Sequence, residues 1–96
     1  MGMMIISLAE LQSKKEDLSS LNQVLASQLR DLQAQIRSLD ADWEGDAADA
    51  FRQRAQRDIQ NMERMVTAVA SYVKALDTII AQYRMAERKN IGIARN

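Results

Sequence analysis

The chain of 96 residues has no proline, no cysteine and no histidine, and only three glycines. Without cysteine there is no disulfide framework and no thiol nucleophile, and without histidine the commonest general base and metal ligand are missing. The 13 basic and 13 acidic residues cancel, so no overall field attracts nucleic acid or an anionic membrane. A chain of 96 residues has the length of a single domain, 1–96, and these absences predict no cofactor and no metal site.

No apolar stretch approaches the roughly 20 residues needed to cross a bilayer. The apolar run at residues 3–6 has no basic residue before it, and it meets Ser7 and Glu10 at once. It spans only about half of the 7–15 apolar residues that a secretory signal peptide needs. We therefore expect a protein made in the cytoplasm which, if exported, leaves the cell without a cleavable signal peptide.

Trp43-Glu44-Gly45 lies near the midpoint and holds the only tryptophan and the only interior glycine. Because no proline breaks the chain, Gly45 is the one strong interruption between two long periodic halves. A glycine can adopt the left-handed conformation that ends a helix, and the neighbouring Asp46 can start the next helix. The sequence predicts a helix over 8–41, a turn over 42–46, a helix over 47–88 and a flexible tail over 89–96.

The first predicted helix has a capping box, in which Ser7 is the N-cap and Glu10 follows three residues later. Its leucines repeat every seven residues, at Leu11, Leu18, Leu25, Leu32 and Leu39. A repeat of seven is the seam of a coiled-coil-like packing, so this helix should pack along its length against a neighbour.

The second predicted helix opens with Asp46 and Asp49, acids that favour a helix N-terminus. Three apolar stripes with a repeat of seven follow. They are Met62, Val69, Leu76 and Tyr83; then Met65, Tyr72 and Ile79; then Ile59, Val66, Val73 and Ile80. The apolar face covers about three-sevenths of the helix circumference, which is broader than one pairing seam.

The expected fold is therefore all-α: an antiparallel helical hairpin that pairs into a four-helix bundle dimer. A lone hairpin would leave half of each apolar stripe in water, and a second hairpin covers it. The partner is either a second copy, which the sequence favours, or a related hairpin. The residues expected in core and dimer packing are Leu18, Leu25, Leu32, Leu39, Met62, Val66, Val69, Val73, Leu76 and Ile80.

No arrangement of residues predicts an enzyme. Five acids gather around the turn: Asp40, Asp42, Glu44, Asp46 and Asp49. We interpret them as helix caps and solubilising charge, rather than as a cation site. There is no Gly-rich phosphate loop and no serine-elbow motif.

With Trp-X-Gly at the bend of two long helices, the chain resembles the Trp-X-Gly (WXG) family of small Esx-type proteins. A second motif agrees, because Tyr83 and Glu87 fit the family's Tyr-x-x-x-Asp/Glu near the end of the second helix. The resemblance implies export by a bacterial type VII (Esx) secretion system, recognition by its ATPase, and a role in virulence. It also implies that Trp43, Gly45, Tyr83 and Glu87 form the export signal.

The two motifs are about 38 helical residues apart, or ~57 Å, so one hairpin cannot present them together. In an antiparallel dimer, the bend of one copy lies beside Tyr83 and Glu87 of the other. We expect the secretion machinery to read this composite surface.

Three alternatives remain open. One is a partner or chaperone subunit for a larger secreted toxin. Another is a membrane-active effector, although nothing in the sequence indicates membrane contact. The weakest is RNA binding, because Arg52, Arg54, Arg57 and Arg64 are interleaved with acids.

Overall fold

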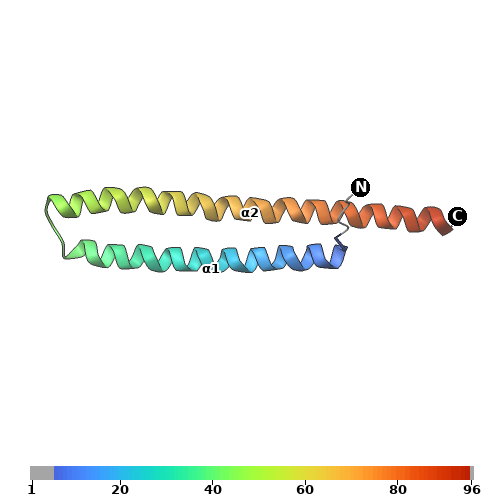
Figure 1. The fold of residues 1–96 in the computed structure, drawn as a ribbon, viewed down its shortest axis with the longest axis horizontal. Coiled ribbons are helices and arrows are strands. Elements are labelled where there is room, and N and C mark those ends of the chain that lie inside the picture. The colour runs from blue at the N-terminus through green and yellow to red at the C-terminus, as the bar shows by residue number, and fades with distance from the viewer. Residues whose placement is uncertain (1–5, 96) are drawn as a thin grey trace.

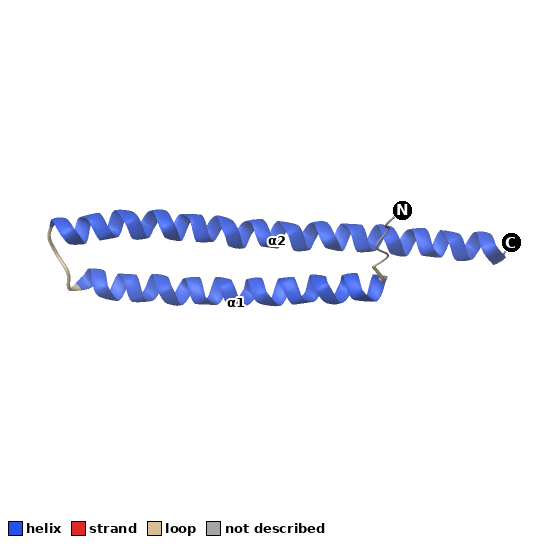
Figure 2. Ribbon diagram, viewed as in Figure 1, coloured by secondary structure: helices blue, strands red, loops and turns tan. Residues whose placement is uncertain are grey.

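The chain forms an elongated helical hairpin of two antiparallel helices. The computed structural model describes residues 6–95, with side chains described as far as residue 89. Helix α1 is Leu8–Ala41 and helix α2 is Asp46–Arg95, and no strand occurs within this part of the chain. The molecule measures 77 × 26 × 16 Å, and α1 begins at the same end at which α2 finishes (Figures 1 and 2). The all-α hairpin is confirmed. Its pairing into a four-helix bundle stays a prediction.

Helix α1 has the predicted bounds and the predicted start. The Ser7 hydroxyl oxygen accepts a hydrogen bond from the Glu10 backbone N–H at 3.1 Å, and the Ser7 carbonyl accepts one from Leu11 at 3.0 Å. The serine half of the capping box is therefore present, and it fixes where the helix begins. Residues 3–5 of the apolar run before it lie outside the described part of the chain.

The bend differs from the prediction in what Gly45 does. Gly45 has φ of 110°, the only positive φ among the described residues, so the need for glycine is confirmed. However, its carbonyl accepts the first helical hydrogen bond of α2, from Asp49 N–H at 3.0 Å. Gly45 is thus the N-cap of α2 and Asp46 is its first helical residue, whereas α1 ends at Ala41 with Asp42 as its C-cap. The prediction that Gly45 ends the first helix was wrong, and α2 begins at Asp46, one residue before the predicted start at residue 47.

The predicted end of the second helix at residue 88 was also wrong, since α2 continues to Arg95. The apolar pattern fades after Glu87 because α2 runs past the start of α1 and loses its packing partner there (Figure 1). The helix continues although α1 no longer packs against it, because Arg88 and Lys89 are good helix formers and Gly92 alone does not stop the helix. The expected flexible tail over 89–96 is helical up to Arg95, and residue 96 lies outside the described part.

The core is small, as two helices require. Within the described residues only Leu29, Ala48, Ala55 and Ile80 are buried. Ala48 and Ala55 lie in the first turns of α2, where short side chains let the helices come close. No helix in this part of the chain is long and apolar enough to span a membrane.

The three predicted stripes of α2 separate by burial. The stripe of Ile59, Val66, Val73 and Ile80 is half-buried to buried, so it faces α1. The stripe of Met65, Tyr72 and Ile79 is exposed, and Tyr72 keeps 60% of its surface in water. This exposed stripe therefore lies on a face of α2 that α1 does not cover.

The predicted packing residues divide in the same way. Ile80 is buried, and seven are half-buried: Leu18, Leu25, Met62, Val66, Val69, Val73 and Leu76. Leu32 and Leu39 are exposed. The exposed leucines join Leu21 and Val24 in an apolar surface on α1 that the hairpin itself does not cover.

Polar contacts between the helices fix their register. The Asn22 side-chain N–H donates to the Val66 carbonyl at 3.0 Å, and Gln33 donates to the Glu63 carboxylate at 2.8 Å. Apolar stripes alone tolerate a shift by one helical turn, whereas such directional bonds are lost in any other register.

Candidate functional site

Arg52 holds the bend together from the second turn of α2. Its Nε donates to the Asp40 carboxylate near the end of α1. Its Nη1 donates to Asp49 Oδ1 at 2.6 Å, and its Nη2 donates to the Trp43 carbonyl at 2.6 Å. One guanidinium thus joins the end of α1, the bend and the first turn of α2, using the fork of donors that only arginine has.

The Trp43 ring packs against the Phe51 ring, with 5.5 Å between the centroids and 47° between the planes. Such a tilted arrangement is favourable for aromatic pairs. The two rings line an open groove together with Gln35, Ser38, Leu39 and Asp42. Trp43 is half-buried, and Leu39 and Phe51 are exposed. The bend therefore presents an accessible apolar surface around the tryptophan.

The acids around the turn have structural partners. Asp40 and Asp49 are paired with Arg52, and Asp46 and Asp49 lie in the first turn of α2, where acids stabilise a helix. Over residues 6–95, no group of three or more acids is placed to hold a metal ion. These contacts give Asp40, Asp46 and Asp49 structural roles at the helix ends.

Two of the four arginines early in α2 are paired as well. Arg52 binds two carboxylates, and Arg54 Nε lies 3.1 Å from Asp58 Oδ2 on the next turn. Phosphate binding needs basic side chains that can replace counterions along a backbone. Carboxylates pair with two of these four arginines and reduce the local positive charge, so the RNA-binding alternative gains no support.

Tyr83 and Glu87 lie on the last part of α2 that runs beside α1. Tyr83 is 56% exposed and Glu87 is exposed, so neither belongs to the hairpin core. Residues four apart on a helix lie on one face, so the ring and the carboxylate can be read together. Tyr83 is therefore not the last core residue of its stripe within the hairpin.

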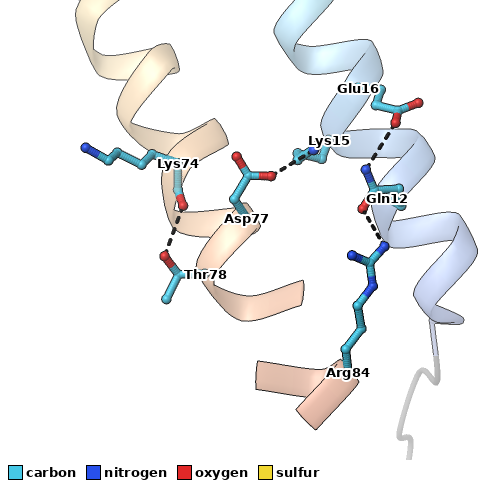
Figure 3. A network of polar contacts seen from close by, with 7 residues as sticks. All are labelled: Gln12, Lys15, Glu16, Lys74, Asp77, Thr78 and Arg84. Atoms are coloured by element: carbon cyan, nitrogen blue, oxygen red, sulfur yellow. Dashed lines mark hydrogen bonds and ion pairs between the residues drawn. The ribbon is translucent and has the colours of Figure 1, made fainter. Parts of the chain in front are cut away.

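A polar network fastens α2 to α1 just before and within this motif (Figure 3). Lys15 Nζ lies 2.7 Å from Asp77 Oδ1 across the helix interface. Gln12 donates to Glu16 at 3.0 Å and accepts a longer hydrogen bond from Arg84 at 3.4 Å. Arg84 directly follows Tyr83, so the network holds the turn of α2 that carries the motif.

The structure does not bring the two motifs together in one chain. Trp43 and Gly45 are in the turn between α1 and α2, while Tyr83 and Glu87 are far along α2, toward the other end of a molecule 77 Å long. The predicted separation of about 38 helical residues holds because α2 is a single uninterrupted helix. Any surface that combines the motifs must therefore use two chains.

The family model described as "Proteins of 100 residues with WXG" matches residues 3–88. The chain belongs to the WXG100 family. No curated protein and no solved structure matches it. Trp43-Glu44-Gly45 lies inside the matched range and supplies the WXG of this WXG100 chain. The fold is the helical hairpin expected of a small Esx-type protein.

Two residues of the bend were missed by sequence reasoning: Phe51 as the ring partner of Trp43, and Arg52 as the link between three segments. The spacing of three between Asp49 and Arg52 does predict a local ion pair on a helix. The contacts to Asp40 and to the Trp43 carbonyl arise only when α2 folds back on α1.

Proposed function

We propose that this WXG100 protein is a secreted substrate of a bacterial type VII secretion system, exported as a folded dimer of hairpins. The observation that carries the proposal is the placement of two accessible motifs at opposite ends of one rigid hairpin. Trp43 and Gly45 form the bend, and Tyr83 and Glu87 lie on an exposed helix face at the far end. Family membership supports the same assignment.

The uncovered apolar surface supports pairing. It runs along both helices and comprises Leu21, Val24, Leu32 and Leu39 of α1 with Phe51, Met65, Tyr72 and Ile79 of α2. At roughly 25 cal/mol per Å² of apolar surface, covering half-exposed side chains of this size yields several kcal/mol. A second hairpin has the length and the apolar stripe to do this, and the zero net charge sets no barrier to self-pairing.

Antiparallel pairing gives the dimer two equal recognition surfaces. The bend of one chain then lies beside the far end of its partner, so Trp43 and Gly45 of one copy meet Tyr83 and Glu87 of the other. We propose that the secretion ATPase reads this combined surface, and that an unpaired chain is not exported. In this role the protein acts by binding alone, without catalysis, cofactor or nucleic acid.

Pairing with a related hairpin, such as one carried by a larger secreted toxin, would cover the same surface. The two cases differ in what the purified chain does by itself. A homodimer should sediment at about 22 kDa, twice the chain mass of 10.9 kDa, with an elongated shape. A monomer that pairs only when a second hairpin protein from the same organism is added would assign it the partner role.

The composite surface is tested with mixed dimers. A Trp43→Ala chain and a Glu87→Ala chain are co-expressed with different tags, and culture medium is probed for particles that carry both tags. In the antiparallel dimer the two substitutions, one from each chain, fall on the same composite surface. The other composite surface combines the unchanged bend of one chain with the unchanged far end of its partner. The mixed dimer should therefore be exported better than either mutant homodimer.

Asp17→Ala serves as the control for Glu87→Ala, because Asp17 is an exposed acid on α1 near the same end of the molecule. Its removal should leave export unchanged. Equal failure of the mixed dimer and both mutant homodimers would refute the composite surface. Undiminished export in a strain without the secretion ATPase would refute the proposed route.

A further inference from the structure

Three contacts of different strength hold Trp43 in the bend. Its N–H lies 3.5 Å from the Asp40 carbonyl oxygen, which is at the outer limit for a hydrogen bond. Its ring touches Phe51, and its carbonyl accepts the 2.6 Å hydrogen bond from Arg52. Phe51 and Arg52 are neighbours on α2, so consecutive residues of one helix fix the ring and the backbone of the tryptophan.

The bond from Arg52 is the strong one. It is short and charge-assisted, and hydrogen bonds of that kind are about twice as strong as neutral ones. The guanidinium is itself held by carboxylates on both helices, Asp40 and Asp49. It is also only 31% exposed, so its orientation is restrained on several sides. Trp43 lies beyond the end of α1 and its backbone bond to Asp40 is weak, so the position of its backbone depends mainly on this arginine.

We propose that Arg52 is a positioning residue for the export signal: it sets the orientation in which Trp43 is presented at the bend. This inference rests on the proposed function and adds to it a residue outside both motifs. The requirement is for arginine in particular. Its planar fork reaches three acceptors in three directions at once, whereas the ammonium of lysine is a single point charge at the end of a flexible stem.

Because Trp43 is the only tryptophan, its fluorescence reports the bend without labelling. The variants are Arg52→Gln, which removes the charge, and Arg52→Lys, which keeps the charge and loses the fork. The matched control is Arg54→Gln, two residues away on α2, where a 74% exposed arginine pairs only with Asp58 in the described structure. Each variant is measured for acrylamide quenching of Trp43, for thermal unfolding by circular dichroism, and for export.

In Arg52→Gln and Arg52→Lys we expect Trp43 to become more accessible to acrylamide while the native helical content is kept. Export should fall about tenfold, the effect of losing one charge-assisted hydrogen bond on an equilibrium. Arg54→Gln should match the wild type in both readouts. A residue that only stabilised the fold would lower the unfolding temperature and leave native-state quenching unchanged.

Unchanged quenching in both Arg52 variants would overturn the proposal, and so would full recovery of quenching and export in Arg52→Lys. If quenching rises but export stays normal while Trp43→Ala is not exported, the positioning claim fails and the proposed function stands. If Trp43→Ala itself is exported normally, the proposed function fails. Should Arg52→Gln not fold, Arg52→Lys decides by the same two readouts.

Discussion

The two ends of the hairpin present their motifs by different physical means. At the bend, the position of Trp43 depends on contacts from another helix, made by the Phe51 ring and the Arg52 guanidinium. It also depends on the turn that the positive φ of Gly45 allows. At the far end, Tyr83 and Glu87 lie on regular helix, and their spacing alone puts them on one face. The bend motif therefore needs the folded hairpin, whereas the far motif needs only a helix. The bend motif should therefore be more sensitive to substitution than the motif of Tyr83 and Glu87.

The largest effect on stability should come from the core near the far end. Ile80 keeps only 2% of its surface exposed, so Ile80→Ala should lower the free energy of unfolding by about 2–4 kcal/mol through lost burial and a cavity. Urea unfolding measures it. Ile79→Ala, the exposed neighbour, is the control and should cost clearly less in the hairpin. Equal losses would mean that Ile79 and Ile80 are buried alike in the assembled protein.

Substitution of glycine by alanine should change the free energy of unfolding in opposite directions at the two ends of the hairpin. Gly45→Ala puts a side chain at φ of 110°, a strain of about 1–3 kcal/mol, although nothing lies within 4 Å of the added methyl group. Gly92 is inside α2, so Gly92→Ala should be neutral or stabilising by up to about 1 kcal/mol. Thermal unfolding of both variants tests the comparison. A neutral Gly45→Ala would show that the bend does not need the positive φ.

Removing the Trp43 side chain separates the recognition role from the structural one. Trp43→Ala loses a half-exposed ring and its contact with Phe51, an aromatic pair worth about 0.5–1.5 kcal/mol beyond its buried area. Helical content should stay near that of the wild type while export falls sharply. Circular dichroism and protein abundance in the culture medium are measured on the same cultures. Normal secretion of the folded variant would exclude Trp43 from the signal.

The smallest effect on stability should come from the far motif. Glu87→Ala removes an exposed acid on regular helix, so the free energy of unfolding should change by no more than about 0.5 kcal/mol. Export should nevertheless fall. A Glu87→Ala protein that is both stable and fully exported would leave the bend as the only recognition element. A large loss of stability would show instead that Glu87 supports the fold.

Much of this architecture follows from local sequence. The Ser7 cap and the leucine repeat gave the exact bounds of α1, because capping and periodicity act within a few residues. The same local character explains why the face shared by Tyr83 and Glu87 could be predicted. The end of α2 could not, since the apolar pattern records where a helix is packed, and α2 continues beyond its partner to Arg95.

What the sequence by itself determined is a helical hairpin, bent at Gly45, with more apolar surface than two helices can bury. Only the tertiary structure decided which stripe of α2 faces α1, which stripe stays exposed, and that Arg52 reaches both Asp40 and the carbonyl of Trp43. The physical reason is the range of the interactions. Helix propensity, caps and turns depend on neighbours in the chain, whereas stripe selection and the Arg52 contacts join residues that meet only after the second helix folds back on the first.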